Sequence, residues 1–76
     1  MKTPLRFLLA DAPDLDDAMV LEVWRGDDML ADVRPGADGW AVTFFAHGQL
    51  VLSLDELDEI RRRAEEFVRE ETGVTS

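Results

Sequence analysis

Apolar and polar residues alternate over most of this chain, and the spacing becomes helical only near the C-terminus. Alternation is typical of strands that bury one face. It predicts strands at about 5–10, 18–25, 29–34, 40–46 and 49–53. From about residue 54 to 72 the apolar residues recur every three or four positions, which predicts one helix. The apolar stripe of that helix comprises Leu54, Leu57, Ile60, Ala64, Phe67 and Val68.

Both ends of this helix carry recognisable signals. Ser53 and Glu56 have the spacing of a capping box, in which each side chain accepts a hydrogen bond from the other residue's backbone amide. Gly73 is placed to end the helix in a left-handed conformation. The face opposite the stripe is charged, with acidic and basic residues four positions apart that support a helix. These pairs are Asp58–Arg62, Glu59–Arg63, Arg61–Glu65 and Glu65–Arg69.

The strands at 40–46 and 49–53 are expected to form a hairpin, for which two registers are possible. A two-residue turn at 47–48 would set Phe45 opposite Leu50. A three-residue turn ending at Gly48 needs positive φ there, which glycine adopts without strain. The three-residue turn also gathers the apolar residues on one face, so burial favours it. That face would hold Trp40, Val42, Phe44, Leu50, Leu52 and Leu54.

The first half of the chain is less clearly patterned. Residues 5–10 fit a strand or another buried segment, and a helix starting at Asp14 competes with the strand at 18–25. The valine-rich alternation favours a strand, and residues 26–28 would turn it into a second hairpin whose register stays open. In one register Trp24 lies on the outer face, beside Met29 or Leu30. The inner face then holds Met19, Leu21, Val23, Ala31 and Val33, and a loop follows at 35–39.

Together these elements predict an α+β fold. We expect an antiparallel β-meander of four to five strands, with one C-terminal α-helix packed on one sheet face. Sequential strands should be neighbours because every connection is short. The 76 residues suffice for a single small domain, and without cysteine neither disulfides nor thiolate metal sites can stabilise it. Such a chain depends on packing or on a second copy of itself.

The formal net charge of −9 excludes several classes of function. Phosphate backbones and anionic membranes attract clustered Lys and Arg, so we expect neither nucleic acid nor membrane as a partner. No apolar run reaches the length of a membrane span, and Arg6 interrupts the apolar start, so we expect no signal peptide and a cytoplasmic protein. The acidity could attract a basic partner, or reflect a bacterial-type composition with one Lys against seven Arg.

No residue pattern here points to catalysis or to a cofactor. His47, the only histidine, falls at a predicted turn, and Ser53 is better used as a helix cap than as a nucleophile. The basic residues 61–63 have acidic neighbours on the helix, so they predict an ion-paired surface. The aspartate-rich segment Asp11–Asp17 could bind a cation, but it lacks the glycine and closing glutamate of a Ca²⁺ loop, and aspartates also favour turns. We therefore expect no catalytic residue, cofactor or metal.

The sheet face turned away from the helix is the candidate functional surface. A contiguous apolar group with aromatic residues would form a contact patch. The predicted interaction residues are Trp24, Leu30, Thr43, Phe45 and Val51. We predict a non-enzymatic protein-interaction module that binds another protein or a second copy of itself as a homodimer. Three alternatives remain: residues 5–10 cover the patch, the Asp11–Asp17 segment binds a cation or small ligand, or the chain is an accessory subunit of an enzyme.

Overall fold

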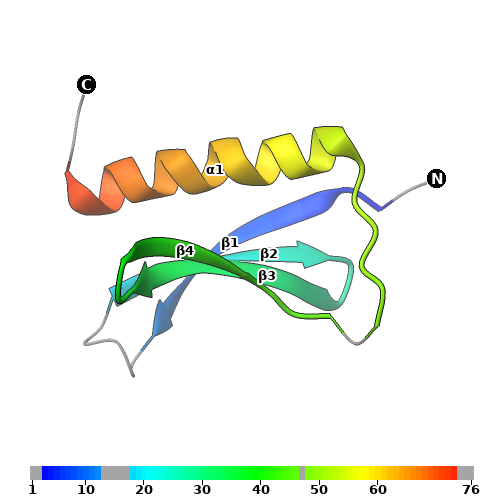
Figure 1. Ribbon diagram of the computed structural model, residues 1–76, viewed down its shortest axis with the longest axis horizontal. Coiled ribbons are helices and arrows are strands. Elements are labelled where there is room, and N and C mark those ends of the chain that lie inside the picture. Colours follow the sequence, from blue (N-terminus) through cyan, green and yellow to red (C-terminus); the bar gives the residue numbers. More distant parts are fainter. Residues whose placement is uncertain (1–2, 13–17, 47, 74–76) are drawn as a thin grey trace.

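The computed structural model describes residues 3–12, 18–46 and 48–73, and it confirms the predicted α+β class. Four antiparallel strands form one sheet, and a single helix lies across one of its faces (Figure 1). The strands lie in chain order, as expected for short connections. They are β1 (Leu5–Ala12), β2 (Ala18–Arg25), β3 (Asp28–Gly36) and β4 (Gly39–Phe44), and the helix is α1 (Leu54–Thr72).

The hairpin between β2 and β3 has the inner face of the one register described from the sequence, which had left the choice open. Leu21 pairs with Val33 and Val23 with Ala31, and all four side chains are buried under the helix. A bulge follows, so that Trp24 pairs with Met29 and Leu30 has no partner on β2. A bulge adds one residue to one strand only, which is why the alternation alone left this register open.

The connection from β3 to β4 is tighter than the predicted loop at 35–39. Pro35 and Gly36 belong to β3, and the pairing with β4 continues to Gly36 and Gly39. The loop prediction was wrong at these positions. The backbone nitrogen of Pro35, which carries no hydrogen, lies on the side of β3 that faces β2, so proline does not interrupt the pairing with β4. The pairing of β3 with β2 accordingly stops at Val33, whereas the pairing with β4 does not need the missing N–H.

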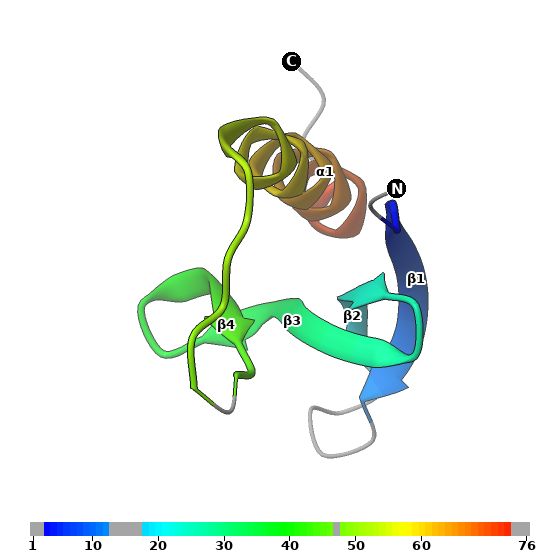
Figure 2. The ribbon, with the colours of Figure 1, turned by 90° about the vertical axis from the view of Figure 1, so that its right-hand side faces the viewer.

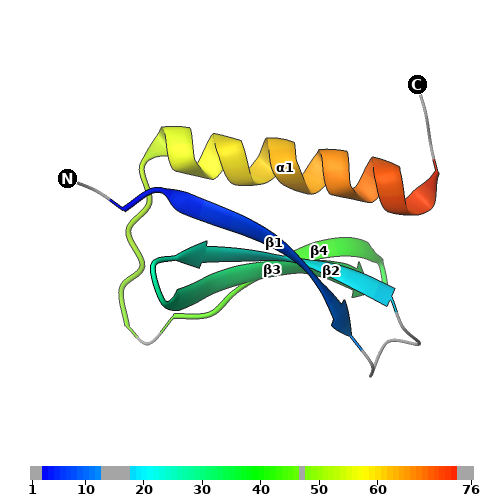
Figure 3. The same cartoon turned by 180° about the vertical axis from the view of Figure 1, so that it is seen from behind.

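The helix packs over the central strands β2 and β3 and reaches toward β1 rather than β4. Its buried residues Ile60, Ala64 and Phe67 pack against β2 and β3, and Phe7 of β1 contacts both halves of this core. The guanidinium of Arg63 lies 5.2 Å from the centre of the Phe7 ring, which closes the β1 side. Figure 2 and Figure 3 show the start of β1 beside the helix, with β4 on the opposite side.

The predicted fifth strand at 49–53 is wrong. After Phe45, whose N–H donates to the Leu30 carbonyl at 2.7 Å, the chain leaves the sheet and climbs to the start of α1 (Figure 1). Gly48 has the expected positive φ of 99°, but it does not return the chain alongside β4. Leu52 instead packs against the core of Val23, Ala31 and Ile60. A short connection from a fifth strand would have drawn the helix over β4 and uncovered that core.

Both predicted ends of the helix are confirmed. The Ser53 hydroxyl accepts from the Glu56 amide at 3.0 Å, and the Glu56 carboxylate accepts from the Ser53 amide at 2.9 Å. Gly73 ends the helix with φ 72°, in the left-handed region. The second carboxylate oxygen of Glu56 forms an ion pair with Arg25 at the end of β2. One side chain therefore caps the helix and ties it to the sheet.

Candidate interaction surface

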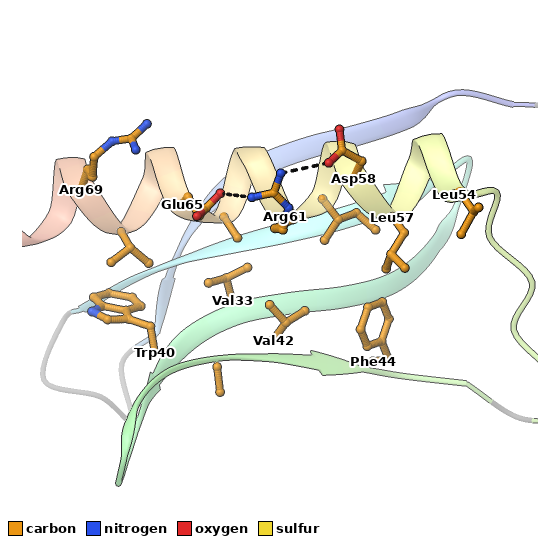
Figure 4. Close-up of a pocket in the computed structure, with 14 residues that line it drawn as sticks. Val33, Trp40, Val42, Phe44, Leu54, Leu57, Asp58, Arg61, Glu65 and Arg69 are labelled. Atoms are coloured by element: carbon orange, nitrogen blue, oxygen red, sulfur yellow. Dashed lines mark hydrogen bonds and ion pairs between the residues drawn. The ribbon is translucent and has the colours of Figure 1, made fainter.

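An apolar groove of about 800 Å³ lies between α1 and β4. Its floor is formed by Trp40, Val42 and Phe44, which point from β4 toward the helix (Figure 4). Its other wall is formed by helix residues, among them Leu57 above Phe44. The groove exists because the helix is displaced toward β1 and the segment expected to form a fifth strand leaves the sheet.

Two residues of the apolar stripe of the helix are exposed although the sequence predicted that they would be buried, and both line the groove. Ile60, Ala64 and Phe67 are buried as predicted, but Leu54 and Leu57 are 84% and 47% exposed. On β4, Val42 and Phe44 are 39% and 42% exposed although they face the helix. Isolated exposed apolar residues are ordinary, whereas a contiguous set on two facing elements is typical of a contact site.

The outer edge of β4 offers free backbone groups to a partner. Phe45 donates to β3, and alternate residues of an antiparallel strand point their N–H and C=O groups to the same side. Gly39, Ala41 and Thr43 therefore bond toward β3, while the groups of Trp40, Val42 and Phe44 point away from it. No strand in the described ranges pairs with that edge. The three residues that expose their backbone are the same ones whose side chains line the groove.

The two edge strands of the sheet differ in charge. β4 reads GWAVTF and carries no charged residue, while the other edge strand, β1, carries Arg6 and Asp11 and follows Pro4. Charges and prolines on an edge strand discourage pairing with another chain. β1 has such protection and β4 does not, so β4 is the edge that is open to strand addition.

The helix side of the groove is lined by charges that balance. Asp58 and Glu65 both accept hydrogen bonds from Arg61, at 3.0 and 2.7 Å, and Arg69 lies further along the same wall. Two acidic and two basic side chains thus line a surface on a molecule whose net charge is −9. The predicted pairs Asp58–Arg62 and Arg61–Glu65 are confirmed. This wall neither attracts a basic partner strongly nor repels an acidic one.

The ion pairs on this wall predict a measurable titration. The hydrogen bond from Arg61, aided by the charges of Arg62 and Arg61, holds the pKa of Asp58 below its ordinary value of 3.8. A lowered folded-state pKa adds stability that is complete above pH 3.8 and is lost as the pH falls through the folded pKa. Carboxyl ¹³C shifts should place the midpoint below 3.8 in the native chain and return it toward 3.8 in Arg61→Gln. An unchanged midpoint in that variant would remove Arg61 as the cause.

The five interaction residues predicted from the sequence do not gather into one exposed patch. Leu30 is buried at the bulge, and Trp24 is half-buried with its indole N–H donating to Glu22 at 3.1 Å. Thr43 and Phe45 are exposed at β4 and just beyond it. Val51 is exposed but lies in the connection rather than on the sheet. Only the β4 end of the predicted patch adjoins the open edge.

The outer face also contains a buried carboxylate. Asp32 of β3 has no exposed surface, and Arg34 donates to its Oδ2 from Nε at 3.1 Å and from Nη2 at 2.6 Å. The other oxygen, Oδ1, is buried without a hydrogen-bond partner. A buried carboxylate needs an opposite charge, which Arg34 supplies. This pair therefore makes the centre of the outer face polar and reduces its value as an apolar contact.

The alternative in which residues 5–10 cover the outer patch is wrong. That segment forms β1, which lies at the far edge of the sheet from β4. His47 and most of the Asp11–Asp17 segment lie outside the described residues. Across the described ranges, no three metal-binding side chains come together and no helix combines the length and apolarity needed to cross a membrane.

Sequence reasoning placed the groove residues correctly but assigned them another role. Trp40, Val42 and Phe44 were expected beneath the helix, and they do face it. Their exposure was missed because a fifth strand was expected beside them. The uncharged composition of β4 was the available signal for an open edge. Comparisons of the chain with protein-family models, with curated proteins and with solved structures found no match.

Proposed function

We propose that this chain is a non-enzymatic protein-interaction module that self-associates through the side of the molecule bearing β4. The observation that carries this proposal is the coincidence of an apolar groove with an unprotected strand edge on the same three residues. A strand edge supplies backbone hydrogen bonds, and side-chain pockets beside it supply specificity. A chain of 76 residues also gains stability from covering such a surface.

The volume of the groove, about 800 Å³, also falls within the usual range of sites for small apolar ligands. Sites of that kind enclose most of the ligand, however. Here Leu54 and Leu57, on the helix wall, are 84% and 47% exposed. The open shape therefore supports a protein surface better than a small molecule.

The proposal is tested by the mass of the native chain in solution. Light scattering after size exclusion, and sedimentation equilibrium from about 1 to 500 µM, should show the 8.6 kDa chain replaced by a species of twice that mass as concentration rises. Weak interfaces of small proteins have dissociation constants in this range. A single 8.6 kDa species at every concentration would overturn self-association.

Two charge substitutions locate the contact. Val42→Glu adds an acid to the groove and the open edge, and should keep the chain monomeric throughout the range. Leu9→Glu is the matched control, because Leu9 is 60% exposed on β1. It adds the same charge at the far edge and should leave the mass profile unchanged. Circular dichroism of both variants checks that the fold is retained.

A further inference from the structure

We infer that two copies of this chain pair their β4 strands antiparallel about a two-fold axis at Val42, which forms one continuous eight-stranded sheet. This inference rests on the proposed self-association and specifies its geometry. The partner that pairs with the outer edge of β4 is a second copy of the chain. Three features of the molecule support it: the direction of the backbone groups of β4, the absence of charge along this strand and the balance of charge beside it.

The direction and the number of the outward backbone groups select the register. Only Trp40, Val42 and Phe44 point their N–H and C=O groups outward. A two-fold pair centred on Val42, with Trp40 of each copy opposite Phe44 of the other, hydrogen-bonds all three of these residues in both copies. Centring on Ala41 or Thr43 would place a non-hydrogen-bonded pair at the axis and hydrogen-bond only two of the three outward residues of each copy. The register follows from the same alternation that makes the β3–β4 pairing.

The side chains support the same arrangement. Trp40, Val42 and Phe44 lie on the helix-facing side of the sheet, so pairing at Val42 brings both sets together beneath the two helices. Aromatic residues across from each other are favourable pairs in antiparallel sheets. Each copy would then contribute an aromatic side chain to the open end of the other's groove.

Charge favours a second copy over a partner of opposite charge. Two molecules of net charge −9 repel each other unless their contact surfaces are locally neutral. β4 is uncharged, and the adjoining helix wall carries two acidic and two basic side chains. A basic partner would instead be drawn to the acidic surfaces elsewhere. Of the two edge strands in the described ranges, β4 is the one without a charged residue, so it is the edge that an equally acidic copy can approach.

The available surface is adequate for such a dimer. A standard protein–protein contact buries about 800 Å² on each partner, which is roughly one seventh of the 5595 Å² exposed by the chain. Strand pairing over residues 40–44, together with the exposed parts of Val42, Phe44, Leu54 and Leu57, corresponds to a contact toward the lower end of that class. We therefore expect an equilibrium between monomer and dimer.

The first experiment removes a backbone donor without removing an internal hydrogen bond. In Val42→Pro the missing N–H is one that points away from β3, so the monomer keeps its sheet pairing. The proposed dimer loses the donor twice, once from each copy. We expect the dissociation constant from sedimentation equilibrium to rise at least about 100-fold. A constant unchanged from the native chain, in a folded variant, would overturn the register.

The second experiment is a cross-link that does not depend on how Val42→Pro folds. The chain has no cysteine, so one introduced thiol can react only with its copy. Directly opposed Cα atoms in a hydrogen-bonded pair are about 5.5 Å apart, within the range of a disulfide. Val42→Cys should form a covalent dimer under mild oxidation. Thr43→Cys is the control, since its two Cα atoms would be about 8 Å apart, beyond that range.

The outcomes separate this inference from the proposed function. A native chain that stays monomeric removes both. A native dimer in which Thr43→Cys cross-links as fast as Val42→Cys retains self-association and overturns the Val42 axis. A native dimer abolished by a charge at Trp24 but not by Val42→Pro would place the contact on the outer face, as the sequence first indicated. Rapid cross-linking of Val42→Cys alone, with weakened association of Val42→Pro, supports the inference.

Discussion

Phe67→Ala should lower the free energy of unfolding by about 3–5 kcal/mol, the largest effect expected of any single truncation here. Phe67 is 4% exposed and packs in the core with Leu21, Val33 and Ala64. Its ring also meets Trp40 edge to face, with 5.5 Å between ring centres. Removing the ring leaves a cavity between the helix and three strands, because none of these elements can close over it without losing other contacts.

Urea denaturation at a concentration where the chain is monomeric measures this loss. Small domains are stable by only about 5–15 kcal/mol, so the variant should melt far below the native chain, by roughly 4–8 °C for each kcal/mol lost. Phe44→Ala is the matched control, because Phe44 is 42% exposed in the groove. It should cost less than about 2 kcal/mol. Equal losses for the two variants would mean that the groove is part of the structural core.

Glu56→Ala should cost about 2–3 kcal/mol, the second largest effect. Glu56 accepts the Ser53 amide in the capping box and also pairs with Arg25. The Glu56 and Arg25 side chains are only 14% and 23% exposed, so solvent replaces little of the lost interaction. Arg25 is left with its charge partly buried, and its Nε already has no hydrogen-bond partner. Removing one partner of such a pair costs more than the pair itself contributes.

Two further variants divide that loss between its causes. Ser53→Ala removes the cap alone and should cost about 1 kcal/mol, which leaves the remainder to the ion pair with Arg25. Glu66→Ala is the control for deleting an acid from the same helix, because Glu66 is exposed. It should change stability by no more than about 0.5 kcal/mol. If Ser53→Ala costs as much as Glu56→Ala, the tie to β2 contributes nothing.

Local signals were sufficient for the helix and for most of the strands. The helix begins after Ser53 and ends at Gly73 because these residues satisfy backbone groups that lie within one turn of them. The inner faces of β2 and β3 follow from alternation, which allows only one face of a strand to be buried. Such features depend on near neighbours in the chain, so they can be predicted from residue order.

The groove could not be predicted in the same way. The segment 49–53 alternates like a strand, yet Leu52 packs into the core and the chain climbs to the helix. Alternation shows which side chains of a segment will be buried, but it does not show which other element will cover them. The positive φ of Gly48 is equally compatible with a hairpin and with a departure from the sheet. The choice depends on where the helix lies, which involves contacts with β1 more than forty residues away.

The sequence by itself determined the α+β class, the order of the strands, the limits of the helix and the apolar side of each strand. The tertiary structure decided that the helix lies over β1 to β3, that no fifth strand forms and that β4 is left with an open edge beside an apolar groove. Capping and alternation act between neighbouring residues. The position of a helix on a sheet instead depends on which distant side chains fill the same space, here Phe7, Val23, Ile60 and Phe67.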